Sequence, residues 1–301
     1  MTALVSAFAR ASHAAYNSGA EQIKVFYDPV ARLLFTQEEY QQICRAMADG
    51  IGYFCPDFTG SREEALRWIV DRHLSPSPLG RAAFAEGALE TAVRTGTRQY
   101  LILGAGYDTF AYRQPDWAQS LQIFELDRPA TIADKKRRLK QGGIPIPPNV
   151  EWTAAELTDS TWSGSLQTGG RFQPDKLSLC SLLGLSYYLE ERDWSRLLRQ
   201  LNKLFKRGSA LVFDFPDAEG GEKIRAQKQR QLAAAAGEGM PAAYSCSRME
   251  TLLEQAGFLI YELLRPEDIT RRYFAPYNYK NPNHPIRAMD NVCYCLAVKR
   301  E

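Results

Sequence analysis

The sequence of 301 residues lacks the features that would indicate a metal protein, a membrane protein or a secreted protein. Its six cysteines form no C-x-x-C pair, and no cysteine and histidine spacing matches a zinc site, so no metal is expected. The first thirty residues hold no uninterrupted apolar stretch of signal-peptide type, and no later run reaches membrane-spanning length. We therefore expect a cytoplasmic protein without a membrane partner.

An excess of charge of either sign is also missing, because the formal net charge is only +2. No basic stripe with interleaved aromatic residues is present, which argues against a nucleic-acid partner. We interpret the basic cluster over residues 135–138 as the solvated face of a helix. What the chain does have is 45% hydrophobic residues, enough to bury a large core.

Short apolar runs alternate with helical patterns from residue 99 onward, which predicts βαβ units and a doubly wound, mostly parallel, Rossmann-like α/β sheet. The expected strands cover residues 99–103, 121–126, 150–154, 177–182, 209–214, 258–264 and 291–298. Helices are expected between the first two strands, through residue 140, and over 191–206 and 247–256. The preceding residues 1–98 are predicted to form a helical cap on a core of residues 99–301, with a helical lid over residues 215–245.

The first predicted strand ends in Gly104-Ala105-Gly106, a pattern typical of a buried strand that leads into a nucleotide-binding turn. Two glycines let the backbone turn sharply and approach a ligand, and a helix starting just afterwards would direct its free N–H groups at that ligand. The next predicted strand ends in Asp127, which lies 21 residues after Gly106 (127 − 106). A carboxylate there can accept hydrogen bonds from ribose hydroxyls.

The residues after Gly106 decide between two cofactors. Position 109 is Thr, whereas a dinucleotide-binding fold has a third glycine there so that the pyrophosphate can sit on the helix N-terminus. Asp108 would repel a diphosphate, which argues against NAD. The cofactor S-adenosyl-L-methionine has a ribose but no phosphate, and its sulfonium cation tolerates nearby carboxylates. On these residues alone, a strand, turn and helix without a ligand stays open as the alternative.

Residues 102–113, with the sequence ILGAGYDTFAYR, together with residues 124–131 resemble the leucine carboxyl methyltransferase family. More narrowly, they are similar to its bacterial branch of O-methyltransferases linked to polyketide and other secondary metabolism. Further stretches agree, namely residues 6–11 with 26–29, 80–84 and 184–189. The resemblance covers residues 5–215 well. It implies a class I methyltransferase fold, S-adenosyl-L-methionine as cofactor, S-adenosyl-L-homocysteine as product and a small-molecule acceptor.

The resemblance also implies roles for residues at the strand ends. Arg81 matches the family's arginine that holds the methionine carboxylate of the cofactor, a task suited to a bidentate guanidinium. Gly104 and Gly106 would pass beneath the methionyl and ribose parts, and Asp127 would take the ribose hydroxyls. Glu125 is the weaker ribose candidate, because strand alternation turns it the same way but deeper into the sheet.

A second group of residues follows the third and fourth predicted strands. Glu156 and Leu157 resemble the family's Asp-Leu pair, so Glu156 would accept from the adenine amino group while Leu157 packs nearby. Leu183 stands where family members often carry Glu, which removes a carboxylate from the reaction centre. Tyr187 and Tyr188 are candidates for lining the acceptor pocket, with core packing as the equal alternative.

A general base is needed only if the acceptor is a hydroxyl, because a carboxylate is already ionised at neutral pH. Of the three histidines, His13 lies in the N-terminal segment that approaches the active site in this family, and it is the candidate base. We interpret His73 and His284 as surface or structural residues.

The sequence thus predicts an O-methyltransferase that acts on a carboxylate or hydroxyl oxygen of a small, secondary-metabolite-like acceptor. Two alternatives belong to functional classes other than the methyltransferases. Leu183 keeps open a cofactor-binding protein that has lost catalysis. An NAD(P)-dependent oxidoreductase is disfavoured by Asp108 and Thr109.

Overall fold

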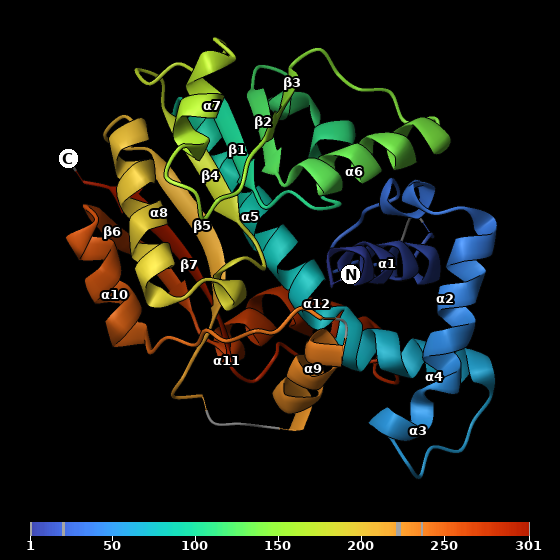
Figure 1. Ribbon diagram of the computed structural model, residues 1–301. Helices are drawn as coiled ribbons and strands as arrows, with labels where there is room; N and C mark the ends of the chain where they lie inside the picture. The colour runs from blue at the N-terminus through green and yellow to red at the C-terminus, as the bar shows by residue number, and fades with distance from the viewer. Residues whose placement is uncertain (1, 20–21, 221–223, 236, 301) are drawn as a thin grey trace.

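The computed structural model describes residues 2–19, 22–220, 224–235 and 237–300. Within these residues a seven-stranded sheet forms the centre of the molecule, in the order β3-β2-β1-β4-β5-β7-β6 (Figure 1). The strands are β1 (Gln99–Leu103), β2 (Gln122–Asp127), β3 (Val150–Ala154), β4 (Ser178–Leu182), β5 (Ala210–Pro216), β6 (Phe258–Leu264) and β7 (Val292–Lys299). All neighbours pair in parallel except β7, which runs antiparallel to both β5 and β6. The predicted doubly wound, mostly parallel sheet is confirmed.

Burial explains why the central strands have continuous apolar sequences. Each residue of β1, β4 and β5 is buried, because helices cover both faces of the sheet. The chain runs outward from β1 through β2 to β3 and then returns to start β4 on the other side of β1. The strand order therefore reverses between β1 and β4, and ligands of such sheets bind in the crevice outside the carboxyl ends at that point.

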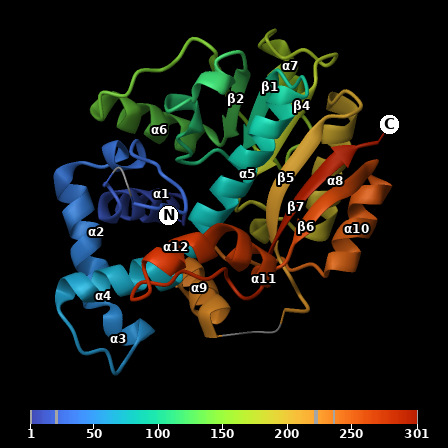
Figure 2. The same ribbon diagram turned by 180° about the vertical axis from the view of Figure 1, so that it is seen from behind.

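Helices cover both faces of the sheet (Figures 1 and 2). One face is covered by α7 (Trp162–Thr168), α8 (Glu191–Leu204) and α10 (Cys246–Gln255). The other face is covered by α5 (Pro76–Arg94), α11 (Pro266–Ile269), the π-helical turn η6 (Thr270–Phe274) and α12 (Ala275–Lys280). Of the remaining helices, α6 (Pro129–Gln141) contacts β2 and β3, and α9 (Ile224–Ala235) follows β5. Among the described residues, no helix has both the length and the apolar character that crossing a membrane requires.

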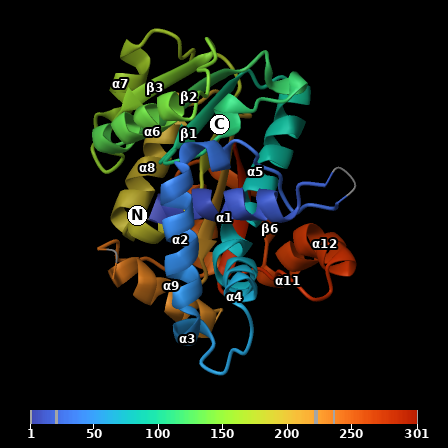
Figure 3. The same cartoon turned by 90° about the vertical axis from the view of Figure 1, so that its right-hand side faces the viewer.

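The chain before the sheet is helical. Its elements are α1 (Thr2–Tyr16), the 3-10 turn η1 (Ala31–Leu34), α2 (Gln37–Asp49), α3 (Ile51–Phe54), α4 (Arg62–Ile69) and the π-helical turn η2 (Val70–Leu74). A capping box of Thr36 and Glu39 starts α2 by satisfying backbone N–H groups of its first turn. In Figure 3 α2 crosses α1, and the rings of Tyr40 and Phe8 pack there with centroids 5.2 Å apart.

The division into a cap over residues 1–98 and a core over residues 99–301 stays a prediction. Leu79 of α5 belongs to the same apolar cluster as Tyr100 of β1. The last helix of the predicted cap therefore packs on the sheet, as one of its covering helices.

The helix predicted between the first two strands is wrong. The described chain after β1 forms a turn and two short 3-10 helices, η3 (Phe110–Tyr112) and η4 (Asp116–Ala118). The Asp108 carboxylate accepts the backbone N–H of Phe110 at 2.8 Å, a local bond that competes with helix formation. Pro115 also disfavours helical geometry at Gln114, because its ring clashes with the preceding residue. In addition, α7 forms between β3 and β4, where no helix was predicted.

The interpretation of residues 135–138 as a solvated helix face is wrong for two of the four. Lys136 and Arg137 are exposed, but Lys135 and Arg138 are buried. The Lys135 Nζ lies 2.8 Å from the Oε2 of Glu125 on β2. A cation can be buried at such a position because a carboxylate compensates its charge.

Candidate active site

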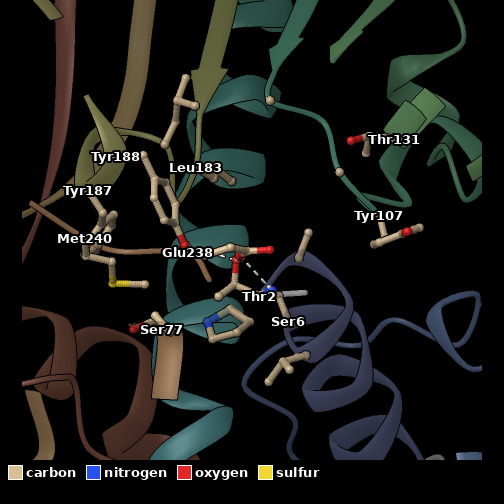
Figure 4. A pocket seen from close by; sticks show the side chains of 18 of the residues that line it. Thr2, Ser6, Ser77, Tyr107, Thr131, Leu183, Tyr187, Tyr188, Glu238 and Met240 are labelled. Carbon is tan, nitrogen blue, oxygen red and sulfur yellow. Dashed lines mark hydrogen bonds between the residues drawn. The ribbon is translucent and has the colours of Figure 1, made fainter. Parts of the chain in front are cut away.

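A cavity of about 890 Å³ lies at the carboxyl ends of β1 to β4 (Figure 4). Part of its wall consists of residues that end or follow these strands, and the rest comes from α1, α2, α3, η2, α5, α9 and residues 237–240. All residues that the sequence analysis assigned to cofactor binding line this cavity: Arg81, Gly104, Gly106, Asp127, Glu156, Leu157 and Leu183. The fold thus brings together residues that are distant in the sequence.

The turn of residues 104–106 after β1, the glycine turn, forms one hydrogen-bonded unit with Asp127. Gly104 and Gly106 have φ angles of +65° and +47°, which residues with a Cβ rarely adopt. The Asp127 Oδ2 accepts the backbone N–H of Gly106 at 2.7 Å, and its Oδ1 accepts that of Arg128 at 2.7 Å. A Cβ added to Gly106 would lie 3.1 Å from the Cβ of Ala3 on α1. The carboxylate is therefore fixed at the cavity wall beside a turn that only glycine fits.

The electrostatics of this turn suit a cofactor without phosphate. Asp108 and Asp127 both line the cavity beside the turn. In the described chain between β1 and β2, the only helical segments are short 3-10 turns, so a diphosphate would find no α-helix N-terminus there. Two carboxylates would repel a diphosphate but attract a cationic group.

Asp28 fastens the glycine turn to the N-terminal helices. Its buried carboxylate accepts from the Arg10 Nε at 2.8 Å and from the Thr109 hydroxyl at 2.6 Å, and the Arg113 Nε lies 3.5 Å away. Arg10 also donates to the carbonyl oxygen of Tyr107 at 2.7 Å. Burial opposes the charged form, but the two guanidinium groups and the Thr109 hydroxyl hold the pKa of Asp28 below its ordinary value. Asp28 could not be assigned a role from the sequence, because its partners are distant along the chain.

Arg81 is oriented by Asp214, a second residue that the sequence analysis missed. The fully buried Asp214 at the end of β5 lies 3.4 Å from the Arg81 Nη1 and accepts the backbone N–H of Gly184 at 2.6 Å. A Cβ added to Gly184 would lie 2.4 Å from the same Nη1. An acid inside the apolar run of β5 was the available signal, because a buried carboxylate needs a compensating partner.

The two candidate tyrosines differ in their environment. Tyr187 is buried and donates its hydroxyl to the Asp214 Oδ2 at 2.9 Å, and burial raises its pKa well above the ordinary value. The Tyr188 hydroxyl lies 3.0 Å from the Thr2 hydroxyl and, with Leu183, borders the cavity (Figure 4). Tyr187 therefore helps to hold the Arg81 partner, while Tyr188 presents a hydroxyl to the cavity.

Glu125 does not belong to the cavity wall. Its carboxylate is buried against Lys135 and accepts hydrogen bonds from the Tyr112 hydroxyl and the Trp152 Nε1, both at 2.8 Å. Burial raises its pKa despite these partners. Of the two acids on β2, Asp127 is the one that reaches the cavity.

His13, the predicted base, is buried on α1 and is not part of the cavity wall. Its Nε2 accepts the backbone N–H of Val25 at 3.3 Å, and its ring packs against Tyr277. Burial and, secondarily, the nearby Arg67 lower its pKa to about 4, so the ring is neutral at pH 7. The structure gives it a packing role.

His73, which we interpreted as a surface or structural residue, does line the cavity. It lies on η2, and its ring packs between Phe54 and Trp68 with centroid distances of 4.7 and 5.4 Å. His284 lies elsewhere, with its Nδ1 3.5 Å from Asp71. Only the meeting of α3, α4 and η2 reveals the position of His73, and no local sequence signal marks it.

The predicted lid over residues 215–245 reaches the cavity through α9 and the loop after it, although its residues 221–223 and 236 lie outside the described chain. Leu232 and Met240 line the cavity, and the Glu238 carboxylate accepts from the Thr2 backbone N–H at 3.0 Å (Figure 4). The segment therefore contacts the start of α1 across the cavity wall.

Three potential metal ligands lie together outside the cavity wall. The ligand atoms of Asp217, Cys246 and Cys293 are all within 4.8 Å of one another and buried. The Cys293 thiol has a pKa raised by burial and by its neighbours, which favours the protonated form over a thiolate ligand. The expectation of no metal stays a prediction.

Known proteins resemble this chain over most of its length. The model of the family described as "Leucine carboxyl methyltransferase" matches residues 3–202. A Bacillus subtilis (strain 168) protein named "Putative S-adenosyl-L-methionine-dependent methyltransferase YktD" is 35% identical over 308 residues, which cover 100% of this chain and 98% of the relative. A Mycobacteroides abscessus protein with the same description is 32% identical over 191 residues, covering 62% of this chain and 61% of that protein.

Solved structures share the fold at low sequence identity. The crystal structure of a "putative methyltransferase" from Thermobifida fusca YX has a TM-score of 0.58 and 17% identity, covering 86% of this chain and 95% of its own. A "duf574 family protein" from Streptomyces avermitilis has a TM-score of 0.57 and 16% identity, covering 84% of this chain and 96% of its own.

Proposed function

This chain belongs to the leucine carboxyl methyltransferase family, and from that premise we propose that it transfers a methyl group to an oxygen atom of a small organic acceptor. It is an S-adenosyl-L-methionine-dependent methyltransferase, as the family and its relatives are. The proposal adds the oxygen acceptor and the residues of the site. The cytoplasmic location stays a prediction.

The main support for this proposal is that all residues assigned to cofactor binding line one cavity. Asp127 would bind the ribose hydroxyls, with Gly104 and Gly106 allowing close approach of the cofactor. Arg81, held by Asp214, would bind the methionine carboxylate through its guanidinium fork. When bound, the cofactor supplies a methyl group activated by a positively charged sulfur.

The adenine would lie beside the loop after β3. At this part of the wall Glu156 is exposed and Leu157 is buried. The Glu156 carboxylate can accept from the exocyclic amino group of the adenine, while Leu157 contacts its ring. Glu is longer than the Asp of the family pattern, and its exposed position gives the extra methylene room.

The acceptor would occupy the part of the cavity that α3, η2, α9 and residues 237–240 surround. Tyr107 follows Gly106 and Thr131 lies on α6 just after Asp127, so both mark the cofactor side of the cavity. Figure 4 shows Met240 and Ser77 well separated from these two residues, so the cavity extends beyond the cofactor side. Methyl transfer removes the positive charge of the sulfonium, so a cavity that excludes water favours the reaction. We propose that residues 215–245 act as the lid that excludes water, which the contact of Glu238 with Thr2 supports.

Titration calorimetry with S-adenosyl-L-methionine, S-adenosyl-L-homocysteine and NADH tests the cofactor assignment. We expect micromolar affinity for the two adenosyl ligands and none for NADH. Binding of NADH alone would support the oxidoreductase alternative. Binding of both adenosyl ligands without turnover of any acceptor would favour a protein that has lost catalysis.

Mass spectrometry of products tests the acceptor atom. The probes are 2-naphthol, 2-naphthoate, 2-naphthylamine and naphthalene-2-thiol, which differ in the nucleophile on one scaffold. We expect methylation of an oxygen compound. Methylation confined to the amine or the thiol would overturn the oxygen acceptor and leave the methyltransferase assignment intact.

A further inference from the structure

The imidazole of His73 lines the cavity and has no role in the cofactor site described above. Among the described residues its ring nitrogens have no hydrogen-bond partner, whereas His13 accepts from Val25 and His284 lies against Asp71. The packing of its ring between aromatic side chains fixes its plane. It lies on a π-helical turn, a geometry that is frequent at functional sites.

Among the described residues, the charged groups that shift the pKa of His73 are all cations. They are Arg72 on η2 and Arg225 and Lys228 on α9. Burial and these three groups lower the pKa of His73 to about 4, so the imidazole is neutral at pH 7 and has a free lone pair. The Lys228 Nζ is itself committed to the carbonyl oxygens of Tyr53 and Phe54, at 2.8 and 3.0 Å.

The same cavity has little to offer an anionic acceptor. Its described lining includes three cationic side chains, Arg10, Arg81 and Arg128. Arg10 is paired with Asp28, and Arg81 is paired with Asp214 and, under the proposed function, with the cofactor carboxylate. Arg128 follows Asp127 at the end of β2, away from the part of the wall formed by α3, η2 and α9. In the lining from α3, η2, α9 and residues 237–240, the ionisable side chains are His73 and Glu238. The three cations that act on His73 are not part of this lining, and the Lys228 Nζ already donates to two carbonyl oxygens. The lining itself therefore offers a carboxylate acceptor no cationic side chain, whereas a neutral hydroxyl needs none.

We propose that the acceptor is a neutral hydroxyl compound, a phenol or an alcohol, and that His73 accepts its proton. This inference rests on the proposed O-methyl transfer. A lone pair of the hydroxyl oxygen forms the new bond to the methyl carbon, the carbon–sulfur bond breaks, and its electron pair stays on the sulfur. The hydroxyl proton moves to a ring nitrogen of His73 and then to water.

The low basicity of His73 is sufficient for this role. The hydroxyl oxygen becomes positively charged as its bond to carbon forms, so its proton becomes far more acidic than that of the free acceptor. An imidazole that is neutral beforehand can then accept it. The Tyr188 hydroxyl, which lies 3.0 Å from that of Thr2, also borders the cavity and can orient the acceptor oxygen.

Nuclear magnetic resonance of the wild-type complex with S-adenosyl-L-homocysteine gives a test that needs no turnover. The probes are 2-naphthol, catechol and benzyl alcohol, each compared with 2-naphthoate or benzoate. We expect hydroxyl probes to shift the His73 ring resonances, assigned with His73→Gln, and the carboxylates to leave them unchanged. No response to any hydroxyl probe, or an equal response to carboxylates, overturns the inference.

Kinetics of variants separate this inference from the proposed function. For His73→Gln we expect methyl transfer to 2-naphthol to fall about 100- to 10,000-fold, with affinity for S-adenosyl-L-homocysteine within twofold and the melting temperature unchanged. Added imidazole should partly restore His73→Ala, which a structural role would not allow. His284→Gln is the matched control and should behave as wild type. Full activity of His73→Gln overturns the role of His73, whereas failure of the wild type to bind either adenosyl ligand overturns the proposed function itself.

Discussion

Arg81 and Asp214 form an ion pair that connects α5 to the end of β5, with Nη1 and Oδ2 3.4 Å apart. The carboxylate is fully buried, and it also accepts the backbone N–H of Gly184 and the hydroxyl of Tyr187. This shared acceptor places the guanidinium at the cavity wall. The guanidinium has five N–H groups, of which Asp214 accepts one and the Ser6 hydroxyl, at 3.3 Å, accepts another. Donors of Arg81 therefore remain for a second carboxylate, as the proposed cofactor provides.

Arg81→Lys should therefore weaken binding of S-adenosyl-L-homocysteine about tenfold, equivalent to about 1.4 kcal/mol. Lysine keeps the charge that Asp214 needs, but it cannot offer a bidentate fork to the methionine carboxylate. Calorimetry with adenosine should show no change, because adenosine lacks that carboxylate. The control is Arg94→Lys, an exposed position at the end of the same helix. Equal loss of adenosine affinity would contradict the placement of Arg81.

Asp127→Ala should weaken binding of S-adenosyl-L-methionine by about 1–3 kcal/mol through the loss of charged hydrogen bonds to the ribose. Adenosine should lose affinity by a similar factor, in contrast to its behaviour with Arg81→Lys. Asp127 also holds the N–H of Gly106, so Asp127→Asn, which keeps one acceptor oxygen, should lose less. The exposed Asp175→Ala serves as control. Unchanged calorimetric affinity of Asp127→Ala would refute the ribose assignment.

The sequence was sufficient to predict the central strands because fully buried strands have continuous apolar runs. The first strand was predicted over residues 99–103, as observed. The helix after it was predicted wrongly, because the turn is determined by the Asp108 carboxylate and by the bond of Thr109 to Asp28. The second of these contacts spans 81 residues, so no local pattern reveals it.

The site likewise has features that local sequence predicts and features that depend on contacts between distant residues. The place of Gly104, Gly106 and Asp127 at one cavity wall could be predicted from sequence, because one strand–turn unit and the strand after it carry them. The acid inside the run of β5 could mark Asp214 as a buried carboxylate, but neither its partner Arg81 nor the place of His73 at the cavity wall could be predicted, since both depend on which elements meet around the cavity. The family pattern supplied Arg81, but its partner on β5 emerged only from the fold.

Lys135→Met should destabilise the protein by about 3–5 kcal/mol, because it leaves the buried Glu125 carboxylate without its cation. The double variant with Glu125→Gln should recover part of this loss, since neither remaining side chain carries a charge. Urea denaturation of the wild type, both single variants and the double variant gives the interaction free energy. Additive effects of the two substitutions would show that the pair is not coupled. Lys140→Met, exposed on the same helix, is the control.

Asp28→Asn should lower the free energy of unfolding at pH 7 by about 3 kcal/mol, because it removes the charge that Arg10 and Arg113 share in a buried site. Burial alone would raise the pKa of Asp28, but the two arginines and Thr109 hold it below its ordinary value of about 3.9 in the folded protein. The stability that this carboxylate contributes is therefore fully present above about pH 3.9.

On acidification that contribution is lost as the pH falls from about 3.9 toward the lower pKa of the folded state, because the unfolded chain binds the proton first. Asp28→Asn cannot bind it, so the stability difference between wild type and variant should shrink across this range. Urea denaturation from pH 7 to pH 3 measures it. Asp49→Asn, which removes a carboxylate from the exposed pair with Arg62, should follow the wild type throughout. A difference that stays constant down to pH 3 would mean that the arginines do not stabilise the charged form of Asp28, and that Asp28 holds the glycine turn through its hydrogen-bond geometry alone.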